Sequence, residues 1–383
     1  MKKLVYLILI LFLFLYCGSK QDEVERIMED GVEVVINHLE PYEIKGESSY
    51  LELAEEIRID FESVDFAEKG LIEPGFVDAD SQGNIYVVNY YRSPEHFIYK
   101  FDKHGQFIKS FGQMGQGPGE IQFFREFNIR NQDKIYISDT GNMKVLELDT
   151  EGNTIKETRI RHGLHETIAL ENDNILARRY IAKPSGDGFD MSIWLYNSDF
   201  QEIKQLDLYR MPELNTGAKN TGLIVSFYWR AANGKIYVGN EQRDYEIWIF
   251  DLEGNLIKKI RKEYTPTEYP EEFKKQTEKI AKANPSTNLV PAKYNPPFNS
   301  FFIDEKNRLF VMTYEPGESK EEYIHDIFNS DGIFIGRASI GISGRLGRAL
   351  NHLKATAKNN RYYRLRYKEN GYVELIVHKM NWE

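Results

Sequence analysis

Short apolar segments alternate with polar turns along most of this chain, and two phrases recur in order. The first is a polar turn that leads into an apolar strand, as in DSQGNIYV (80–87), NQDKIYIS (131–138), ENDNILA (171–177), ANGKIYVG (232–239) and DEKNRLFVM (304–312). The second is a strand, turn and strand, as in YKFDKHGQFIKSF (99–111), LELDTEGNTIKET (146–158), LYNSDFQEIKQL (195–206), IFDLEGNLIKKI (249–260) and IFNSDGIFIGRA (327–338). Asp or Asn leads the turn each time, which is typical of antiparallel hairpins.

Each unit therefore contains four strands, and such a unit cannot bury both of its faces alone. A ring of repeated units solves this problem, so the pattern predicts an all-β, six-bladed β-propeller of four-stranded antiparallel blades. The sixth unit, RYYRLRYKENGYVELIVHKM (361–380), offers only three strands. We expect YLELAEEIRIDF (50–61) to supply the fourth and close the ring, which places the propeller in residues 50–383.

The segment IYISDTGNMKVLELDTEG (135–152) resembles an NHL repeat, whose usual form is strand, Asp-Thr-Gly-Asn, basic residue, strand, Asp-x-x-Gly. DSQGNIYVVN, followed later by GQGPGE, is similar to the six-bladed propeller lipoproteins of Bacteroidetes-type bacteria. The resemblance covers roughly residues 50 to 380. It implies a propeller that is anchored at the bacterial cell envelope through an N-terminal lipid.

The glycine loop FGQMGQGPGEIQ (111–122) raises the question of a phosphate-binding loop. No Gly-Lys-Ser/Thr follows it, and the next residues lead into a strand region rather than a helix. We therefore interpret it as the connector between the first two blades.

The largest departure from the repeat is an insertion at 262–298, between the fourth and fifth blades. It holds six of the thirteen prolines, and PEEFKKQTEKIAKAN (270–284) within it is predicted to be a helix. Two roles are open for this helix: a lid over the central channel, or a decoration packed beside its blade.

Alternating strands place the two tight turns of each blade on one face of the ring, which we call the tight-turn face. The longer loops and the connectors between blades lie on the opposite, loop-rich face, and variable loops on rigid scaffolds tend to carry function. Candidate ligand contacts on this face combine aromatic side chains with arginine, a pairing typical of sugar, peptide or anion recognition. They are Tyr91, Arg92, Arg179, Tyr180, Tyr228, Trp229, Arg230, Arg345 and Arg348.

The N-terminus reads as an export signal. Lys2 and Lys3 precede an apolar run from Leu4 to Tyr16, which is too short to span a bilayer comfortably. Cys17, the one cysteine of the sequence, follows it and is the expected site of lipid attachment, although Tyr16 departs from the usual small residue. We therefore expect a signal peptide at 1–16, a tether at 17–49, and a protein that is lipid-anchored to a bacterial membrane, on its periplasmic side or at the cell surface.

Charge and motifs narrow the function further. The formal charge of −10 becomes −12 when Lys2 and Lys3 are removed, which argues against nucleic-acid binding. The sequence contains no Gly-x-Ser-x-Gly or His-Glu-x-x-His motif, so a binding or scaffold role is favoured over an enzymatic one. We expect a monomer without a cofactor that recognises an envelope protein, peptide or glycan. The alternative is a metal-dependent hydrolase or lactonase with calcium in the central channel, for which Asp78, Asp139 and Asp304 are available.

Overall fold

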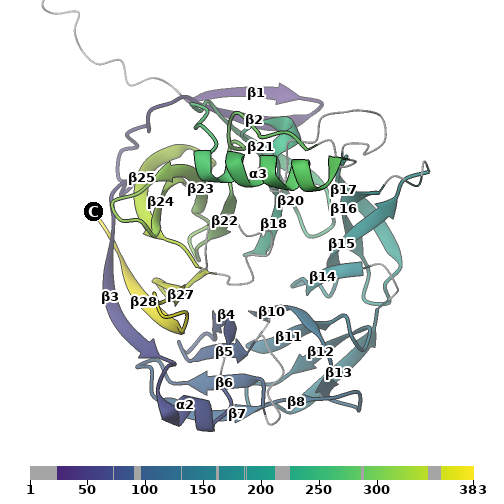
Figure 1. Cartoon of the computed structure of the whole chain (residues 1–383). Helices are drawn as coiled ribbons and strands as arrows, with labels where there is room; N and C mark the ends of the chain where they lie inside the picture. Colours follow the sequence, from purple (N-terminus) through teal and green to yellow (C-terminus); the bar gives the residue numbers. More distant parts are fainter. Residues whose placement is uncertain are drawn as a thin grey trace, which may run out of the picture.

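The computed structural model describes residues 24–71, 73–89, 96–130, 132–160, 164–184, 186, 188–211, 225–285, 289–343 and 355–383. Six four-stranded antiparallel sheets stand in a ring around a common axis, as the repeat predicts (Figure 1). The fold is therefore a six-bladed β-propeller.

Each of the first three blades uses four consecutive strands, counted from the axis outwards. They are β4 (Pro74–Ala79), β5 (Ile85–Asn89), β6 (Ile98–Phe101) and β7 (Phe107–Phe111); β10 (Phe124–Arg130), β11 (Lys134–Asp139), β12 (Lys144–Leu148) and β13 (Thr154–Arg159); and β14 (Leu164–Ala169), β15 (Ile175–Ala182), β16 (Phe189–Tyr196) and β17 (Glu202–Tyr209).

The fourth and fifth blades follow the same order, and the sixth combines both ends of the chain. They are β18 (Phe227–Ala232), β19 (Lys235–Asn240), β20 (Glu246–Phe250) and β21 (Leu256–Lys262); β22 (Ser300–Ile303), β23 (Leu309–Pro316), β24 (Glu322–Phe328) and β25 (Phe334–Gly341); and β26 (Thr356–Lys358), β27 (Arg361–Tyr367), β28 (Val373–Trp382) and β3 (Leu51–Asp60).

The recurring turn residue has the same task in five blades. Its side-chain oxygen accepts the backbone N–H groups two and four residues later, at 2.7 to 3.0 Å. The residues that do this are Asp102, Asp149, Asn197, Asp251 and Asn329. The fourth position of each turn has positive φ, which Gly adopts without strain and which Phe200 adopts in the third blade. The repeated Asp or Asn is thus explained by the hydrogen bonds that it accepts in the hairpin turns.

Buried apolar side chains form six clusters, and each cluster fills the seam between two neighbouring blades. Tyr86, Phe97 and Phe124, for example, share the cluster between the first and second blades. The core is therefore a set of sheet-to-sheet interfaces arranged in a ring, and every blade depends on both of its neighbours.

The ring is closed by the antiparallel pairing of β3 with β28, as the sequence predicted. The register runs from Leu51 opposite Trp382 to Asp60 opposite Glu374. Backbone hydrogen bonds between Tyr50 and Glu383 continue the pairing past the end of the strand. A short helix, α2 (Val64–Glu68), then leads the chain from the rim towards the first blade.

The described residues before β3, which the sequence predicted to be part of a tether, form regular structure on the outside of the ring. β1 (Glu25–Glu29) and β2 (Val32–Asn37) form a hairpin, and β2 pairs in parallel with β21, the outer strand of the fourth blade. The chain then crosses the rim of the fifth blade, where the N–H of Tyr42 donates to the carbonyl of Phe334 at 2.8 Å. The N-terminal segment thus binds the outsides of the fourth, fifth and sixth blades in turn (Figure 1).

The glycine loop is the connector from β7 to β10, as predicted, and contains the short parallel pair β8 (Gln113–Met114) and β9 (Glu120–Ile121). Gly112 has a φ of 81° and packs against the ring of Phe97, where a Cβ would lie 2.4 Å from a ring carbon. The N–H of Gly117 donates to Glu120 Oε2 at 2.7 Å. These contacts make the loop a packed joint.

The predicted helix is α3 (Glu271–Ala283), and Pro270 is its N-cap. Figure 1 shows α3 across β20 and β23 rather than over the centre of the ring. Its base is fixed by its own flanking segments, because the N–H of Tyr269 donates to the carbonyl of Lys293 at 3.0 Å. This arrangement favours the decoration over the lid.

Asn37 offers a test of the N-terminal segment. Its fully buried amide donates to the carbonyls of Arg261 at 3.2 Å and Gly332 at 3.0 Å, and it accepts the N–H of Phe334 at 2.7 Å. Asn37→Ala leaves these groups unpaired, so we expect the free energy of unfolding to fall by about 2–4 kcal/mol in chemical denaturation. Glu40→Ala, at an exposed position three residues later, is the control and should change it by less than about 0.5 kcal/mol. Equal effects from both variants would show that the segment is not fastened at Asn37.

Candidate functional site

The inner strands of all six blades surround a cavity of about 290 Å³ on the axis of the ring. Residues from the second half of each inner strand and from the turn after it line this cavity, among them Asp78, Arg130, Arg230, Asp304 and Lys358. Because every inner strand runs from the loop-rich face towards the tight-turn face, the cavity lies at the tight-turn end of the channel. We call it the channel cavity.

One wall of the channel cavity is a polar stripe along β10. Side chains alternate across a strand, so Glu126, Asn128 and Arg130 share one side, while Phe127 and Ile129 pack into the seam with the first blade. Glu126 is 4% exposed and Asn128 is 8% exposed. An acidic, a neutral and a basic group therefore follow one another along the axis, in a position where the neighbouring backbone fixes their spacing.

Two guanidinium groups reach this cavity, one from the second blade and one from the fourth. Arg130 donates across the channel to the carbonyl of Ala231. Arg230 donates to the Oη of Tyr228 and, at 3.1 Å, to the carbonyl of Trp229. Burial lowers the pKa of Arg230 to about 10 and also lowers the pKa of Arg130, because a buried site disfavours the charged form.

The hydrogen-bond partners of these two arginines are neutral oxygens. In the part of the chain that the structure describes, no carboxylate forms an ion pair with Arg130 or Arg230. Two carboxylates of the lining have other partners: Asp78 lies 2.7 Å from the Nζ of Lys358, and Asp304 lies 2.7 Å from Arg308. The two guanidinium groups therefore face the channel cavity without a carboxylate in direct contact, while Glu126 in the same lining acts on both charges at longer range.

Two buried polar atoms of the stripe have no hydrogen-bond partner among the described residues. They are the Oδ1 of Asn128, an acceptor, and the Nη1 of Arg130, a donor. Buried polar groups in native proteins are nearly always hydrogen-bonded. The cavity thus offers both kinds of bond to whatever occupies it.

The predicted contact residues are distributed between several environments. Arg230 reaches the channel cavity, whereas Trp229, the residue before it, is 3% exposed and packs in the seam with the third blade. Tyr228 packs edge-on against Phe301, with 5.1 Å between the ring centroids. The structure brings Arg230 alone of these three into the cavity.

The other predicted contacts lie apart from the cavity. Arg179 forms an ion pair with Glu202 at 2.7 Å, and the ring of Tyr180 lies between those of His165 and Phe189. The remaining candidates fall outside the described residues, and for them the binding role stays a prediction. They are Tyr91, Arg92, Arg345, Arg348 and the lipid-attachment residue Cys17.

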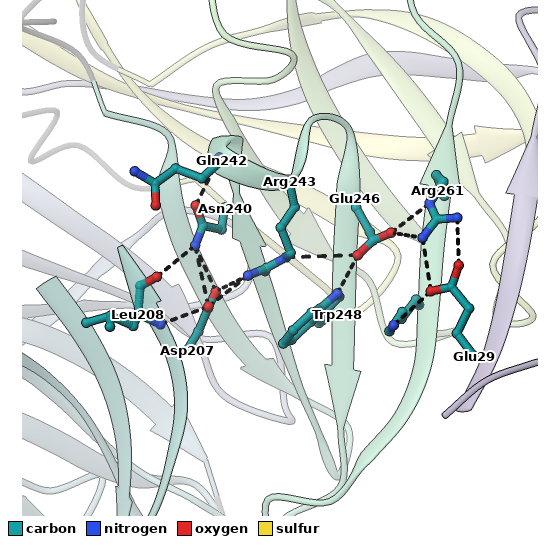
Figure 2. A network of polar contacts seen from close by, with 10 residues as sticks. Glu29, Asp207, Leu208, Asn240, Gln242, Arg243, Glu246, Trp248 and Arg261 are labelled. Carbon is teal, nitrogen blue, oxygen red and sulfur yellow. Dashed lines mark hydrogen bonds and ion pairs between the residues drawn. The ribbon is translucent and has the colours of Figure 1, made fainter. Parts of the chain in front are cut away.

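Polar side chains on the loop-rich face form a continuous network, shown in Figure 2. Arg243 donates to both carboxylate oxygens of Asp207 at 2.7 and 2.8 Å, which joins the fourth blade to the third. Its guanidinium carbon lies 3.8 Å from the ring centroid of Trp248, whose indole N–H donates to Glu246. These side chains tie neighbouring blades together.

The network continues to the rim of the ring. Arg261 donates to Glu246 at 2.7 Å and to Glu29 of β1 at 3.0 Å (Figure 2). Lys259 also donates to Glu29, at 2.9 Å. The charges that the network displays are therefore paired with one another and fasten the N-terminal hairpin.

The carboxylates considered for a channel-bound calcium do not converge. Asp78 and Asp304 line the channel cavity but are held by Lys358 and Arg308. Asp139 ends β11 at the loop-rich side and accepts the N–H groups of Gln122 and Phe123. Among the residues described, no three His, Cys, Asp or Glu side chains form a group that could hold a metal ion. These residues do not fit the calcium site of the alternative function.

Comparisons with known proteins support the fold. A family model described as a 6-bladed beta-propeller (DUF5128) matches residues 73–209, which form the first three blades. No curated protein sequence matches the chain. In the described part of the chain, no helix combines the length and the apolar character needed to cross a membrane.

Solved structures that are similar to this chain include two Bacteroides proteins. A Bacteroides fragilis protein whose name proposes export has 14% identity and a TM-score of 0.52, over 91% of this chain and 99% of its own. A member of the DUF4221 family from Bacteroides vulgatus has 14% identity and a TM-score of 0.54, over 88% and 99%. A gluconolactonase from Xanthomonas campestris has 11% identity and a TM-score of 0.40, over 87% and 99%, a score too low to carry an argument. Identities of this size establish the fold alone.

Glu29 allows a test of the network by pH. Hydrogen bonds from Arg261 and Lys259 lower its pKa from 4.5 to about 2. A carboxylate whose pKa is lower in the folded state stabilises the fold above the unfolded pKa and loses this effect as the pH falls through the folded pKa. Glu29→Gln should therefore lower the Tm at pH 6, and the difference from the wild type should shrink as the pH falls from 4.5 towards 2.

Glu25→Gln removes a charge from the exposed start of the same strand and is the matched control. Thermal denaturation of the three proteins at intervals of half a pH unit supplies the comparison. A Tm difference between wild type and Glu29→Gln that stays constant from pH 6 to pH 2 would show that the ion pair with Arg261 does not fasten the hairpin.

Proposed function

We propose that this protein is an exported, lipid-anchored propeller that binds a small polar ligand in the channel cavity. The observation that carries this proposal is the pair of guanidinium groups, Arg130 and Arg230, which face the cavity without a carboxylate partner. A buried charge without a counter-charge costs several kcal/mol, so it is retained where something else supplies the partner. A ligand with an anionic group would fill that place.

Binding is favoured over catalysis because of what surrounds the arginines. Asp78 and Asp304 of the lining are held by Lys358 and Arg308, and the described lining of the cavity includes no His, Ser or Cys side chain. The unpartnered atoms of Asn128 and Arg130 can orient a ligand, but they supply neither a nucleophile nor a general base at neutral pH. The arrangement supports capture of a molecule without its conversion.

We also propose that a protein, peptide or glycan partner binds the loop-rich face. On that face Arg243 is already ion-paired with Asp207 of the third blade. Charges that are already paired in this way are less available to bind a small charged ligand. We therefore place the small-ligand site in the channel and leave the loop-rich face for a larger partner.

Export and anchoring rest on the N-terminal sequence. Lys2, Lys3 and the apolar run to Tyr16 have the form of a secretory signal, and Cys17 stands where bacterial lipoproteins are acylated. The described part of the fold begins soon afterwards, with β1 at Glu25 on the rim of the fourth blade. An anchored ring would therefore stand close to the membrane with this rim towards it.

The channel proposal predicts that small polar compounds stabilise the full chain. We would measure the Tm of the protein, purified in mild detergent, with a panel of sugars, amino acids, carboxylates and phosphate, and titrate the best compound by calorimetry. Arg130→Gln should lower the affinity for that compound at least about tenfold, because a hydrogen bond to a charged group contributes about 1.5–3 kcal/mol. Arg179→Gln is the control and should leave the affinity unchanged. An affinity that depends on Arg179 and not on Arg130 would place the site outside the channel cavity.

The anchor predicts a particular processed N-terminus. After expression in a bacterium with a lipoprotein pathway, we expect the mass of the mature protein to correspond to a chain that starts at Cys17 and carries acyl groups. Cys17→Ala should abolish the acyl mass and release the protein from the membrane fraction. An unmodified Cys17 in a membrane-free protein would contradict the anchor and leave the channel proposal untouched.

A further inference from the structure

We infer that the ligand of the channel cavity is a hydroxylated organic monoanion, with one carboxylate at Arg130 and at least one hydroxyl group at Asn128. This inference rests on the proposed function and specifies the chemistry of its ligand. It follows from the order of the groups along β10 and from the two atoms there that lack partners.

The anionic end is assigned by the arginines. Arg130 keeps Nη1 without a partner, although its Nη2 is held in place by the carbonyl of Ala231. A guanidinium fixed in this way is a planar donor whose geometry matches that of a carboxylate. Arg230 adds a second positive charge to the same cavity from the fourth blade. An anion at this point would be attracted by both guanidinium groups.

The hydroxyl end is assigned by Asn128. Its side chain is 8% exposed, and its buried Oδ1 can only accept a hydrogen bond. Two residues along a strand are separated by about 6.6–6.8 Å, and their side chains lie on the same side. The ligand therefore needs a donor about one sugar ring away from its carboxylate. A hydroxyl group supplies that donor without adding charge.

Glu126 limits the charge of the ligand. It occupies the next position of the stripe, two residues before Asn128, and is 4% exposed. A second anionic group at that end would lie beside this carboxylate in a buried setting, where repulsion between like charges is strong. The stripe therefore favours a monoanion with a neutral, hydroxylated end over a dianion. A cavity of about 290 Å³ has room for a molecule of hexose size.

Three probes separate the two parts of this inference. Glucuronate has the carboxylate and the hydroxyls, cyclohexanecarboxylate has only the carboxylate, and glucose has only the hydroxyls. With the full chain in mild detergent, calorimetry should give glucuronate an affinity at least tenfold higher than that of either other probe.

Two variants link each part to its residue. Arg130→Gln should reduce the affinity for glucuronate to that for glucose, and Asn128→Leu should reduce it to that for cyclohexanecarboxylate. Asn128→Leu should leave the affinity for cyclohexanecarboxylate unchanged, whereas a general loss of structure would lower that affinity too. Arg230→Gln serves in place of Arg130→Gln if the latter does not fold, and Arg179→Gln is the matched control outside the cavity.

The outcomes distinguish this inference from the proposed function. Equal affinities for glucuronate and cyclohexanecarboxylate would show that the ligand's hydroxyl group is not recognised. Equal affinities for glucuronate and glucose would show that its carboxylate is not recognised. In both cases the cavity would remain a binding site. Binding of none of the three probes would overturn this ligand class, and the wider panel would still decide whether the cavity binds anything. Glucuronate binding that ignored both variants would place the site elsewhere and overturn both proposals.

Discussion

Closure of the ring by β3 and β28 is the constraint on which the rest of this structure depends. A propeller blade buries its faces only against two neighbours, so a ring with one open seam would expose two apolar surfaces. The closing pair joins residues more than three hundred positions apart, from Leu51 opposite Trp382 to Asp60 opposite Glu374. The entropy cost of bringing distant segments together grows only with the logarithm of their separation, so one long strand pair can hold the ring.

Closure also determines what happens on the axis. Six inner strands surround a narrow space, and their side chains cannot turn away from it without entering a packed seam. Lys358 shows the consequence, because its ammonium group on the sixth blade donates to the carbonyls of Ala79 in the first and Ile129 in the second. Arg130 likewise crosses from the second blade to Ala231 of the fourth. Polar groups on the axis are thus held by several blades at once, and a binding site built there is preorganised by the whole ring.

The sequence was sufficient for the parts of the fold that local chemistry determines. Turn residues such as Asp102 and Asp251 use their side chains to hold hairpin turns, so the blades could be counted from them. The third blade departs from the repeat at one position, because Phe200 has the positive φ that Gly has in the other four turns. The hairpin of β1 and β2 was not foreseen, since its partner β21 lies more than two hundred residues away and pairs with it in parallel.

The candidate site was foreseen only in part, for a related reason. Arg230 was selected together with Trp229, but alternation along the strand sends the arginine to the cavity and the tryptophan into a seam. Glu126, Asn128 and Arg130 were missed because a polar residue at every second position also describes an ordinary strand with one side in water. Their position in the sequence could have identified them, because EFNIR lies in the first strand of its blade. In a propeller the first strand of each blade lies next to the axis.

Charges on the loop-rich face and in the channel cavity have different partners, and this difference supports the proposal of a small-ligand site in the cavity. On the loop-rich face, Arg243 pairs with Asp207 of the third blade, and Arg261 pairs with Glu29 of the N-terminal hairpin. In the channel cavity, Arg130 has neutral partners only, although Asp78 in the same lining could have compensated it and is paired with Lys358 instead. Paired charges contribute to the order of the ring. A buried charge without an ion-pair partner tends to weaken a fold, and the proposed anionic ligand would supply that partner.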